Sequence, residues 1–147
     1  MDITAATDQH IEAVCLIDEI VLGNASRREY LFQAILDGKC YIAKMDHEPA
    51  GFIIYDTTFY HHAFIWLVIV SPRYRRKGIA TALIQHIESI SPTEKLFTST
   101  NESNTDMHHL CESLGFAKSG WIENLDEGDP EIVYYKSREI RLNHVET

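Results

Sequence analysis

The segment that decides the fold runs from Ile65 to Ile84 and reads IWLVIVSPRYRRKGIATALI. Its opening apolar run, Ile65–Val70, is rich in β-branched residues and predicts a strand. Pro72 breaks the strand, a basic stretch follows, and apolar residues recur at helical spacing after Gly78. A strand that passes through a basic glycine turn into a helix can hold phosphate, because a helix start carries unpaired N–H groups and partial positive charge.

Strand and helix patterns flank this segment on both sides. Further strands are expected over residues 2–6, 40–45, 51–59, 96–100, 116–122 and 132–136. Helices are expected to start at Thr7 or Asp8, at a Ser26–Glu29 capping box, after Gly78, and at a Ser103–Asp106 capping box. This order predicts one mixed α/β (α+β) domain over residues 1–147, with three successive strands forming an antiparallel meander around the middle of the chain. The polar tail after Ser137 is expected to fray.

The composition is that of an ordinary globular protein, with 45% apolar and 24% charged residues in 147. No apolar run approaches the ~20 residues of a membrane span, and the first residues lack the pattern of a signal peptide. We therefore expect a cytoplasmic protein without a membrane partner. Cys15, Cys40 and Cys111 lie far apart without metal-ligand spacing, so we expect reduced thiols, no disulfide and no metal.

The charge is strongly negative overall but locally basic. With 13 basic and 22 acidic residues the formal net charge is −9, which argues against nucleic acid as a partner. The basic residues of the turn stand out against this background: Arg73, Arg75, Arg76 and Lys77. Two surfaces of opposite sign are expected, one suited to an anionic cofactor and the other to a cationic substrate.

The turn itself contains an R-x-x-G-x-A pattern, from Arg75 to Ala80. The GxxxxGK[ST] pattern of a P-loop is absent, and the segment has one glycine where a dinucleotide fingerprint needs three. By itself the pattern is equally consistent with a solvated basic turn. The longer run V-x-P-x-x-R-x-x-G-I-A, from Val70 to Ala80, resembles the acyl-coenzyme A motif of the GCN5-related N-acetyltransferase (GNAT) superfamily.

A second motif of that superfamily lies at the expected distance, where Asn104 precedes a helix that ends in Leu114-Gly115-Phe116. The resemblance implies a GNAT-type acyl-CoA N-acyltransferase fold, a central mixed, mostly antiparallel sheet of about seven strands flanked by four helices. It also implies acetyl-CoA as the acyl donor and allows a homodimer.

The resemblance assigns cofactor-binding roles to the turn and its flanks. The strand residues that would pair with the pantetheine arm are Val68, Ile69 and Val70. The residues whose N–H groups would surround the pyrophosphate are Arg76, Lys77, Gly78, Ile79, Ala80 and Thr81. Arg75, Arg76 and Lys77 would add positive charge. Asn104 would bind pantetheine or stabilise the turn beneath it, and a plain helix start is the alternative for this residue.

The catalytic positions depart from the superfamily pattern. Many relatives carry a proton-donating tyrosine where this chain has Cys111, and the positions of their glutamate bases match Ser99 and Phe64. Cys111 is either a proton donor or a small buried side chain. The substitutes that we consider for the base or acid are Glu102, Tyr134, Tyr135, His61 and His62.

These observations predict an N-acetyltransferase that moves an acetyl group from acetyl-CoA to a primary amine by direct attack. An acidic loop follows residue 122, and its carboxylates could attract a cationic acceptor: Glu123, Asp126, Glu127, Asp129 and Glu131. A solvated acidic loop is the alternative. The alternative function is an acyl-CoA-binding sensor or interaction module without efficient transfer, because the usual tyrosine and glutamate are missing.

Overall fold

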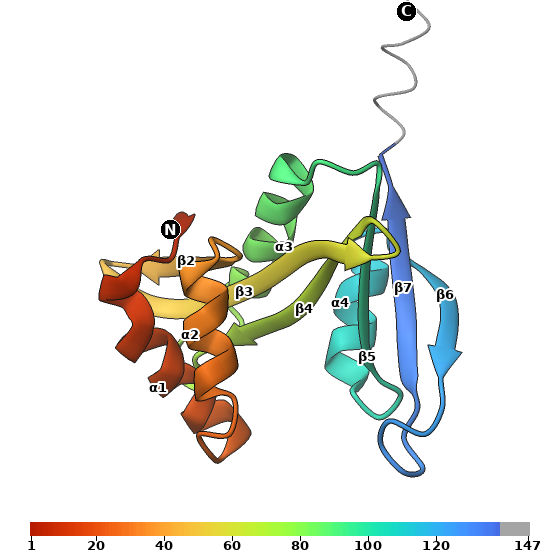
Figure 1. Cartoon of the computed structure of the whole chain (residues 1–147), viewed down its shortest axis with the longest axis horizontal. Coiled ribbons are helices and arrows are strands. Elements are labelled where there is room, and N and C mark those ends of the chain that lie inside the picture. Colours follow the sequence, from red (N-terminus) through yellow and green to blue (C-terminus); the bar gives the residue numbers. More distant parts are fainter. Residues whose placement is uncertain (139–147) are drawn as a thin grey trace, which may run out of the picture. The chain divides into compact units, whose positions relative to one another are not determined.

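The structure is a computed structural model that describes residues 1–138; residues 139–147, where the tail was expected to fray, lie outside the described residues. Strands and helices follow in the predicted order (Figure 1). They are β1 (Asp2–Ala5), α1 (Ile11–Leu22), α2 (Arg28–Leu36), β2 (Cys40–Met45), β3 (Glu48–Phe59), β4 (His62–Val70), α3 (Ile79–Ile90), β5 (Lys95–Asn101), α4 (Thr105–Ser113), β6 (Ala117–Ile122) and β7 (Glu131–Ser137). Short 3₁₀ turns, η1 (Asp8–His10) and η2 (Pro72–Tyr74), precede α1 and α3.

The strands form one sheet in the order β1-β2-β3-β4-β5-β7-β6. β4 and β5 pair in parallel, whereas β1 with β2, β2 with β3, β5 with β7 and β6 with β7 pair antiparallel. The predicted mixed α/β fold, with a mostly antiparallel sheet of seven strands and four α-helices within residues 1–138, is confirmed. No helix in this part of the chain is long and apolar enough to cross a membrane.

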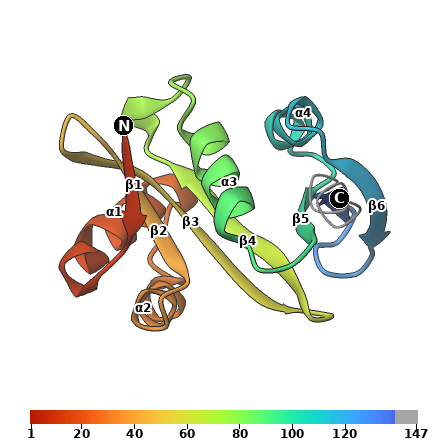
Figure 2. The same ribbon diagram turned by 90° about the horizontal axis from the view of Figure 1, so that it is seen from above.

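The chain folds as two compact units, and the first comprises residues 1–55 and 66–90. Figure 2 shows α1 and α2 on one side of β2 and β3, with α3 on the other side. Leu31 of α2 and Ile42 and Phe52 of the sheet are buried in one apolar cluster with α1. Leu83 and Ile87 of α3 are also fully buried, as their helical spacing predicts.

The second unit comprises residues 56–65 and those from Ser91 onward. It holds β5, β7 and β6, with α4 against one face of these strands (Figure 2). Tyr134 of β7 and Cys111 of α4 are buried on this side. The β3–β4 hairpin closes through Tyr60 and His61, whose positive φ angles of 51° and 65° match the twist of a two-residue hairpin turn.

Two predicted capping boxes do not form. Arg27 stands at the start of α2 without a side-chain cap, and its guanidinium donates to the buried Asp18 carboxylate at 2.5 and 3.1 Å. The buried charge requires this partner. α4 is capped by Asn104, so the prediction of a Ser103 cap was wrong; Ser103 instead donates to Asp129.

β3 begins at Glu48, three residues before the predicted start at Gly51. The reason lies in the preceding turn, where Asp46 and His47 have φ angles of 50° and 67°. In a two-residue hairpin turn the residues directly before and after the turn pair with each other, so Met45 pairs with Glu48.

Candidate functional site

The end of β4 is the first part of the site in the first unit. Leu67 and Ile69 pack against the apolar cluster beneath α1 and α2, so the alternation of a strand places Val68 and Val70 on the opposite face. The parallel pairing of β4 with β5 runs from Ala63 to Ile65. The backbone of Leu67 to Val70 lies beyond that ladder, on the edge where another extended chain could pair.

Gly51 of β3 sets how closely the strands and α3 approach one another. A Cβ atom on Gly51 would lie 2.8 Å from the Ile69 carbonyl oxygen and 3.1 Å from Cγ2 of Ile79. It would also lie 3.4 Å from Cα of Val70. Because Gly51 has no side chain, the end of β4 and the first residue of α3 can both pack closely against β3. These are the two segments that the resemblance assigns to binding of the acyl donor.

The first half of the turn is anchored to the β2–β3 hairpin. The Tyr74 N–H donates to the Ser71 carbonyl at 2.9 Å, and the Tyr74 hydroxyl donates to the Glu48 carboxylate. The hydrogen bond to this carboxylate raises the pKa of Tyr74. Nη1 of Arg73 lies 3.3 Å from Oε2 of Glu48, so the charge of Arg73 is already paired.

The second half of the turn opens toward solvent. Arg76 and Gly78 have φ angles of 62° and 77°, a left-handed conformation that costs glycine nothing. No atom would lie within 4 Å of a Cβ on Gly78, and the first α3 hydrogen bond is donated by Ala82 to the Gly78 carbonyl at 3.0 Å.

The N–H groups of Ile79, Ala80 and Thr81 precede that bond and have no partner four residues back. The side chains of Arg75, Arg76 and Lys77 are exposed next to these N–H groups. Within residues 1–138 these three cations form no ion pair. Open space, unpaired N–H groups and free positive charge together form an anion-binding concavity. These residues therefore fit a phosphate ester.

Asn104 marks the start of α4 in the second unit. Its side-chain oxygen accepts a hydrogen bond from the Met107 N–H at 3.2 Å, which is the geometry of a helix cap. Its backbone N–H donates to Asn101 at 3.0 Å. The oxygen of Asn104 thus stabilises its own turn, and its amide N–H groups are the part that could reach a ligand.

A partly buried hydrogen-bond network holds this turn against β7. The hydroxyl of Tyr134, whose side chain is 0% exposed, lies 2.6 Å from Nδ1 of His108. Nε2 of His108 lies 3.1 Å from the Asn101 carbonyl and 3.0 Å from the Glu102 carbonyl. Carbonyl oxygens only accept, so Nε2 carries a proton and donates to them. The Tyr134 hydroxyl and Nδ1 share the remaining hydrogen bond. Burial raises the pKa of Tyr134.

Sequence reasoning missed His108, although a signal was present. His108 lies three residues before the buried Cys111 and four after Asn104, so it shares their face of α4. Cys111 itself is 1% exposed, and burial raises the pKa of its thiol to about 11. The thiol stays protonated at neutral pH and is enclosed by the fold. Glu102 is exposed, and its carbonyl oxygen is the part that joins the network.

The positions of the missing glutamates have other uses here. Ser99 donates a hydrogen bond of 2.7 Å to Oε2 of Glu131 on β7. Phe64 is buried with its ring centroid 4.6 Å from that of Phe59. His61 is exposed in the hairpin turn, and the ring of its neighbour His62 lies against Phe97 at 5.6 Å.

The acidic loop is partly tied to the β5–α4 turn. The Asn101 amide donates to Asp126 at 2.8 Å, while the Ser103 N–H and hydroxyl donate to Asp129 at 3.0 and 2.6 Å. These Ser103 hydrogen bonds lower the pKa of Asp129. Glu123 and Glu127 are exposed. Two of the predicted acceptor-attracting carboxylates therefore also hold the loop in place.

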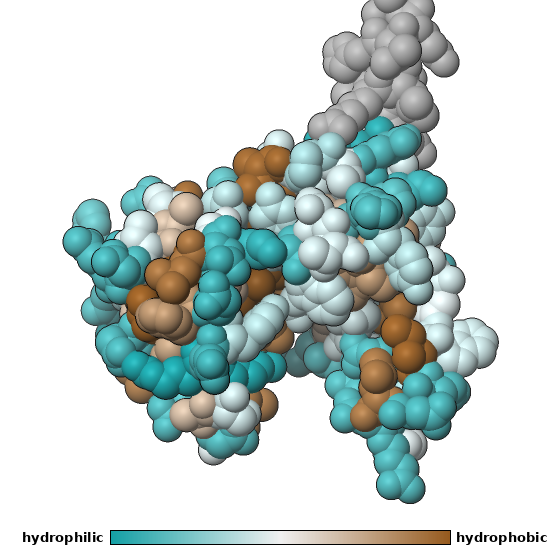
Figure 3. Space-filling view, in the orientation of Figure 1, coloured by the Kyte–Doolittle hydropathy of each residue, from teal (hydrophilic) through white to brown (hydrophobic). Residues whose placement is uncertain are grey.

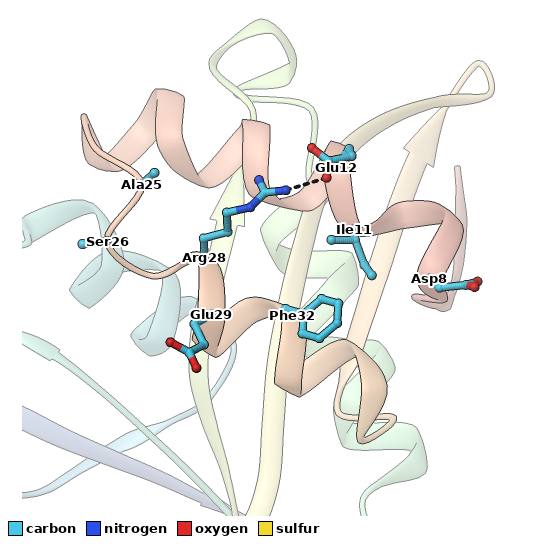
Figure 4. Close-up of a pocket in the computed structure, with 8 residues that line it drawn as sticks. All are labelled: Asp8, Ile11, Glu12, Ala25, Ser26, Arg28, Glu29 and Phe32. Atoms are coloured by element: carbon cyan, nitrogen blue, oxygen red, sulfur yellow. Dashed lines mark hydrogen bonds and ion pairs between the residues drawn. The ribbon is translucent and has the colours of Figure 1, made fainter.

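A further hollow, of ≈ 710 Å³, lies between α1 and α2. In Figure 4 Ile11 of α1 and Phe32 of α2 point toward one another, and Arg28 reaches across to Glu12 with 2.5 Å between Nη2 and Oε1. Asp8 and Glu29 also line this hollow. Within residues 1–138, no group of three or more His, Cys, Asp or Glu side chains is arranged to hold a metal ion. The expected absence of a metal stays a prediction.

Comparison with known proteins gives consistent matches. The model of the Acetyltransferase (GNAT) family matches residues 14–116. A GNAT-family acetyltransferase from Bacillus cereus ATCC 10987 is 45% identical, with 93% of this chain and 96% of that chain covered and a TM-score of 0.90. A comparison with curated proteins gave no match.

Two more distant solved structures share the fold. The ribosomal-protein-alanine N-acetyltransferase from Brucella melitensis is 18% identical, with 94% of this chain and 100% of that chain covered and a TM-score of 0.74. A Bacillus anthracis protein in complex with acetyl coenzyme A is 21% identical, with 67% of this chain and 61% of that chain covered and a TM-score of 0.62.

Proposed function

Because the chain belongs to the GNAT acetyltransferase family, we propose that it transfers an acetyl group from acetyl-CoA to a primary amine. The observation that carries the proposal is the open turn before α3, where Gly78 has a φ of 77° and no atom would meet its Cβ within 4 Å. The relative bound to acetyl coenzyme A supports the donor, and the relative named for a ribosomal-protein alanine supports an amine acceptor.

Each predicted binding residue has a role that its surroundings permit. The N–H groups from Arg76 to Thr81 bind the pyrophosphate, and Arg75 with Lys77 adds charge that speeds capture of an anionic ligand. The backbone of Val68–Val70 pairs with the amide groups of the pantetheine arm. Asn104 holds the start of α4 through its oxygen and can donate to the arm through its nitrogen.

The transfer proceeds by direct attack of a neutral amine on the thioester carbonyl. The new C–N bond forms, the C–S bond breaks, the thiolate takes up a proton and the amine nitrogen loses one. A strand N–H that donates to the carbonyl oxygen stabilises the charge that develops there. A thiol with a pKa of ~8.5 is a tolerable leaving group, so the step does not need the buried thiol of Cys111 as an acid.

A thermal shift with coenzyme A tests the binding site. Ligand at 100 times Kd should raise the unfolding free energy by about 2.7 kcal/mol. Gly78→Val should abolish this increase. The control is Gly38→Val, because Gly38 also has a positive φ, 72°, and no atom within 4 Å of a built Cβ. An equal shift in both variants would contradict the proposed site.

One observation favours the alternative of an acyl-CoA sensor: Cys111, at the position of the usual tyrosine, is buried and stays protonated. Release of free coenzyme A in the presence of an amine panel separates the two functions. Release that depends on both the amine and an intact Gly78 supports transfer. Binding of acetyl-CoA without release on polyamines, aminoglycosides, amino acids and peptides supports the sensor.

A further inference from the structure

The face of β5 and β7 opposite α4 carries a groove that the transfer mechanism above does not use. Its volume is ≈ 460 Å³, and its lining includes Phe59, His62, Phe97, Ile122 and Val133. Apolar residues gather over this part of the sheet in Figure 3, which is viewed from the side away from α4. All of these residues belong to the second unit, so one compact body forms the groove.

The walls of the groove are aromatic and fixed by mutual contact. The ring centroid of Phe97 lies 5.2 Å from that of Phe59, 5.6 Å from that of His62 and 6.0 Å from that of Tyr135. Among the residues that the structure describes, no lysine or arginine lines the groove. A preformed aromatic surface without cations suits a flat apolar group and does not repel a positive charge.

A carboxylate stands on the same face. Ser99 lies two residues after Phe97 on β5, and Glu131 lies two residues before Val133 on β7. Because Ser99 pairs with Val133, all four side chains share one side of the sheet. Oε2 of Glu131 accepts the Ser99 hydroxyl at 2.7 Å, and within residues 1–138 Oε1 has no partner. Strand pairing thus brings a carboxylate from β7 to Ser99 of β5.

From this juxtaposition we infer that Glu131 and the groove form an acceptor subsite for primary amines that bear an aromatic group. The ammonium donates to the free oxygen of Glu131, and the ring lies against Phe97. Oε2 of Glu131 lies 2.7 Å from the Ser99 hydroxyl, and Ser99 and Phe97 are ~7 Å apart along β5, which matches a linker of about two or three carbons between nitrogen and ring. The inference names the acceptor class of the proposed acetyltransferase and rests on that function, whereas the binding itself requires no acetyl-CoA.

The test measures the Kd of 2-phenylethylamine for the full chain without acetyl-CoA, by calorimetry or amide chemical-shift changes. Ethylamine is the probe that lacks the ring. Glu131→Gln keeps an acceptor for Ser99 and removes the charge, and Glu127→Gln removes an equal charge from an exposed position of the same loop. We expect tighter binding of 2-phenylethylamine than of ethylamine. Glu131→Gln should raise its Kd about tenfold, with no change in Glu127→Gln.

A second variant fills the subsite from within the chain. Ile122 pairs directly with Glu131 and is 42% exposed, so Ile122→Lys can place an ammonium on the carboxylate without disturbing the core. It should abolish binding of 2-phenylethylamine while the melting temperature stays within a few degrees. Equal affinity for the two amines, no binding, or equal effects of Glu131→Gln and Glu127→Gln would each overturn the inference.

The outcome is separable from that of the proposed function. If coenzyme A causes no thermal shift, the acetyltransferase proposal fails, yet the amine measurements still decide the subsite. If amines are acetylated and Glu131→Gln leaves the KM for 2-phenylethylamine unchanged, the acetyltransferase proposal stands and the subsite is refuted.

Discussion

Gly51→Ala is the perturbation that most directly tests the construction of the site. The added Cβ would lie 2.8 Å from the Ile69 carbonyl oxygen, which is about 0.6 Å short of an ordinary contact beginning at 3.4 Å. The obstacle is backbone, so no side-chain rotation relieves it. Ile79 limits movement in another direction, with Cγ2 at 3.1 Å. The end of β4 must therefore withdraw from β3.

The expected cost follows from two opposing effects. Overpacking of this kind costs about 1–3 kcal/mol of unfolding free energy. Replacing a glycine stabilises by about 0.4–1 kcal/mol through the unfolded chain. The net loss is about 1–2 kcal/mol, and the melting temperature should fall by roughly 2–8 °C. Displacement of Ile69 and Val70 should also weaken coenzyme A binding by about tenfold, the equivalent of one strained or lost hydrogen bond.

Denaturant unfolding and a coenzyme A titration measure the two effects. Gly120→Ala is the matched control, since Gly120 also lies in a strand and a Cβ there would meet no atom within 4 Å. The control should be neutral or slightly more stable and should bind coenzyme A normally. If Gly51→Ala behaved like Gly120→Ala in both assays, the close approach of β3 to β4 would not position this site, and the reasoning would fail.

Two pH-dependent predictions follow from side chains in the second unit. Ser103→Ala should raise the pKa of Asp129 toward its ordinary value in a carboxyl NMR titration, because the lost hydroxyl donates to that carboxylate. Because the pKa of Asp129 is lowered in the folded state, its carboxylate stabilises the fold above the unfolded-state pKa of about 3.9, and this stabilisation is lost as the pH falls below it. Ser103→Ala should therefore lose less stability in acid than the parent protein. An unchanged pKa of Asp129 would contradict this account. For Cys111, whose pKa is raised from 9.0 to about 11 by burial, the unfolded thiol loses its proton at lower pH than the folded one. The unfolding free energy should therefore fall as pH rises from 9 to 11, by up to about 1.4 kcal/mol per unit, and Cys111→Ala should show a shallower slope in denaturant titrations; identical slopes would refute the effect.

Much of the fold was readable from local patterns. The bounds of β2, Cys40–Met45, were predicted to the residue. The GNAT resemblance drawn from Val70–Ala80 and Asn104 is confirmed by the family match over residues 14–116. Such features depend on residues close in sequence, so their physics is visible without the fold.

The predictions that were wrong concern side chains whose partners lie far away in the sequence. The capping box expected at α2 does not form because Arg27, not Ser26, stands at the N-cap position, where its guanidinium binds the buried Asp18. At α4 the hydroxyl of Ser103 donates to the loop residue Asp129 and Asn104 caps the helix. A hydroxyl that can cap a helix can equally donate to a carboxylate that the fold brings near, as Ser103 does to Asp129. No local pattern records that choice.

The sequence by itself determined the open turn before α3. Gly78 supplies the left-handed backbone, the residues beside it supply charge, and the helix start supplies unpaired N–H groups, all within a few positions of one another. Only the tertiary structure decided the rest of the candidate site. Tyr134 meets His108, and Glu131 meets Ser99, because antiparallel pairing and the packing of α4 join segments 26 and 32 residues apart. Hydrogen bonds at such separations depend on strand register and burial, which no short stretch of sequence specifies.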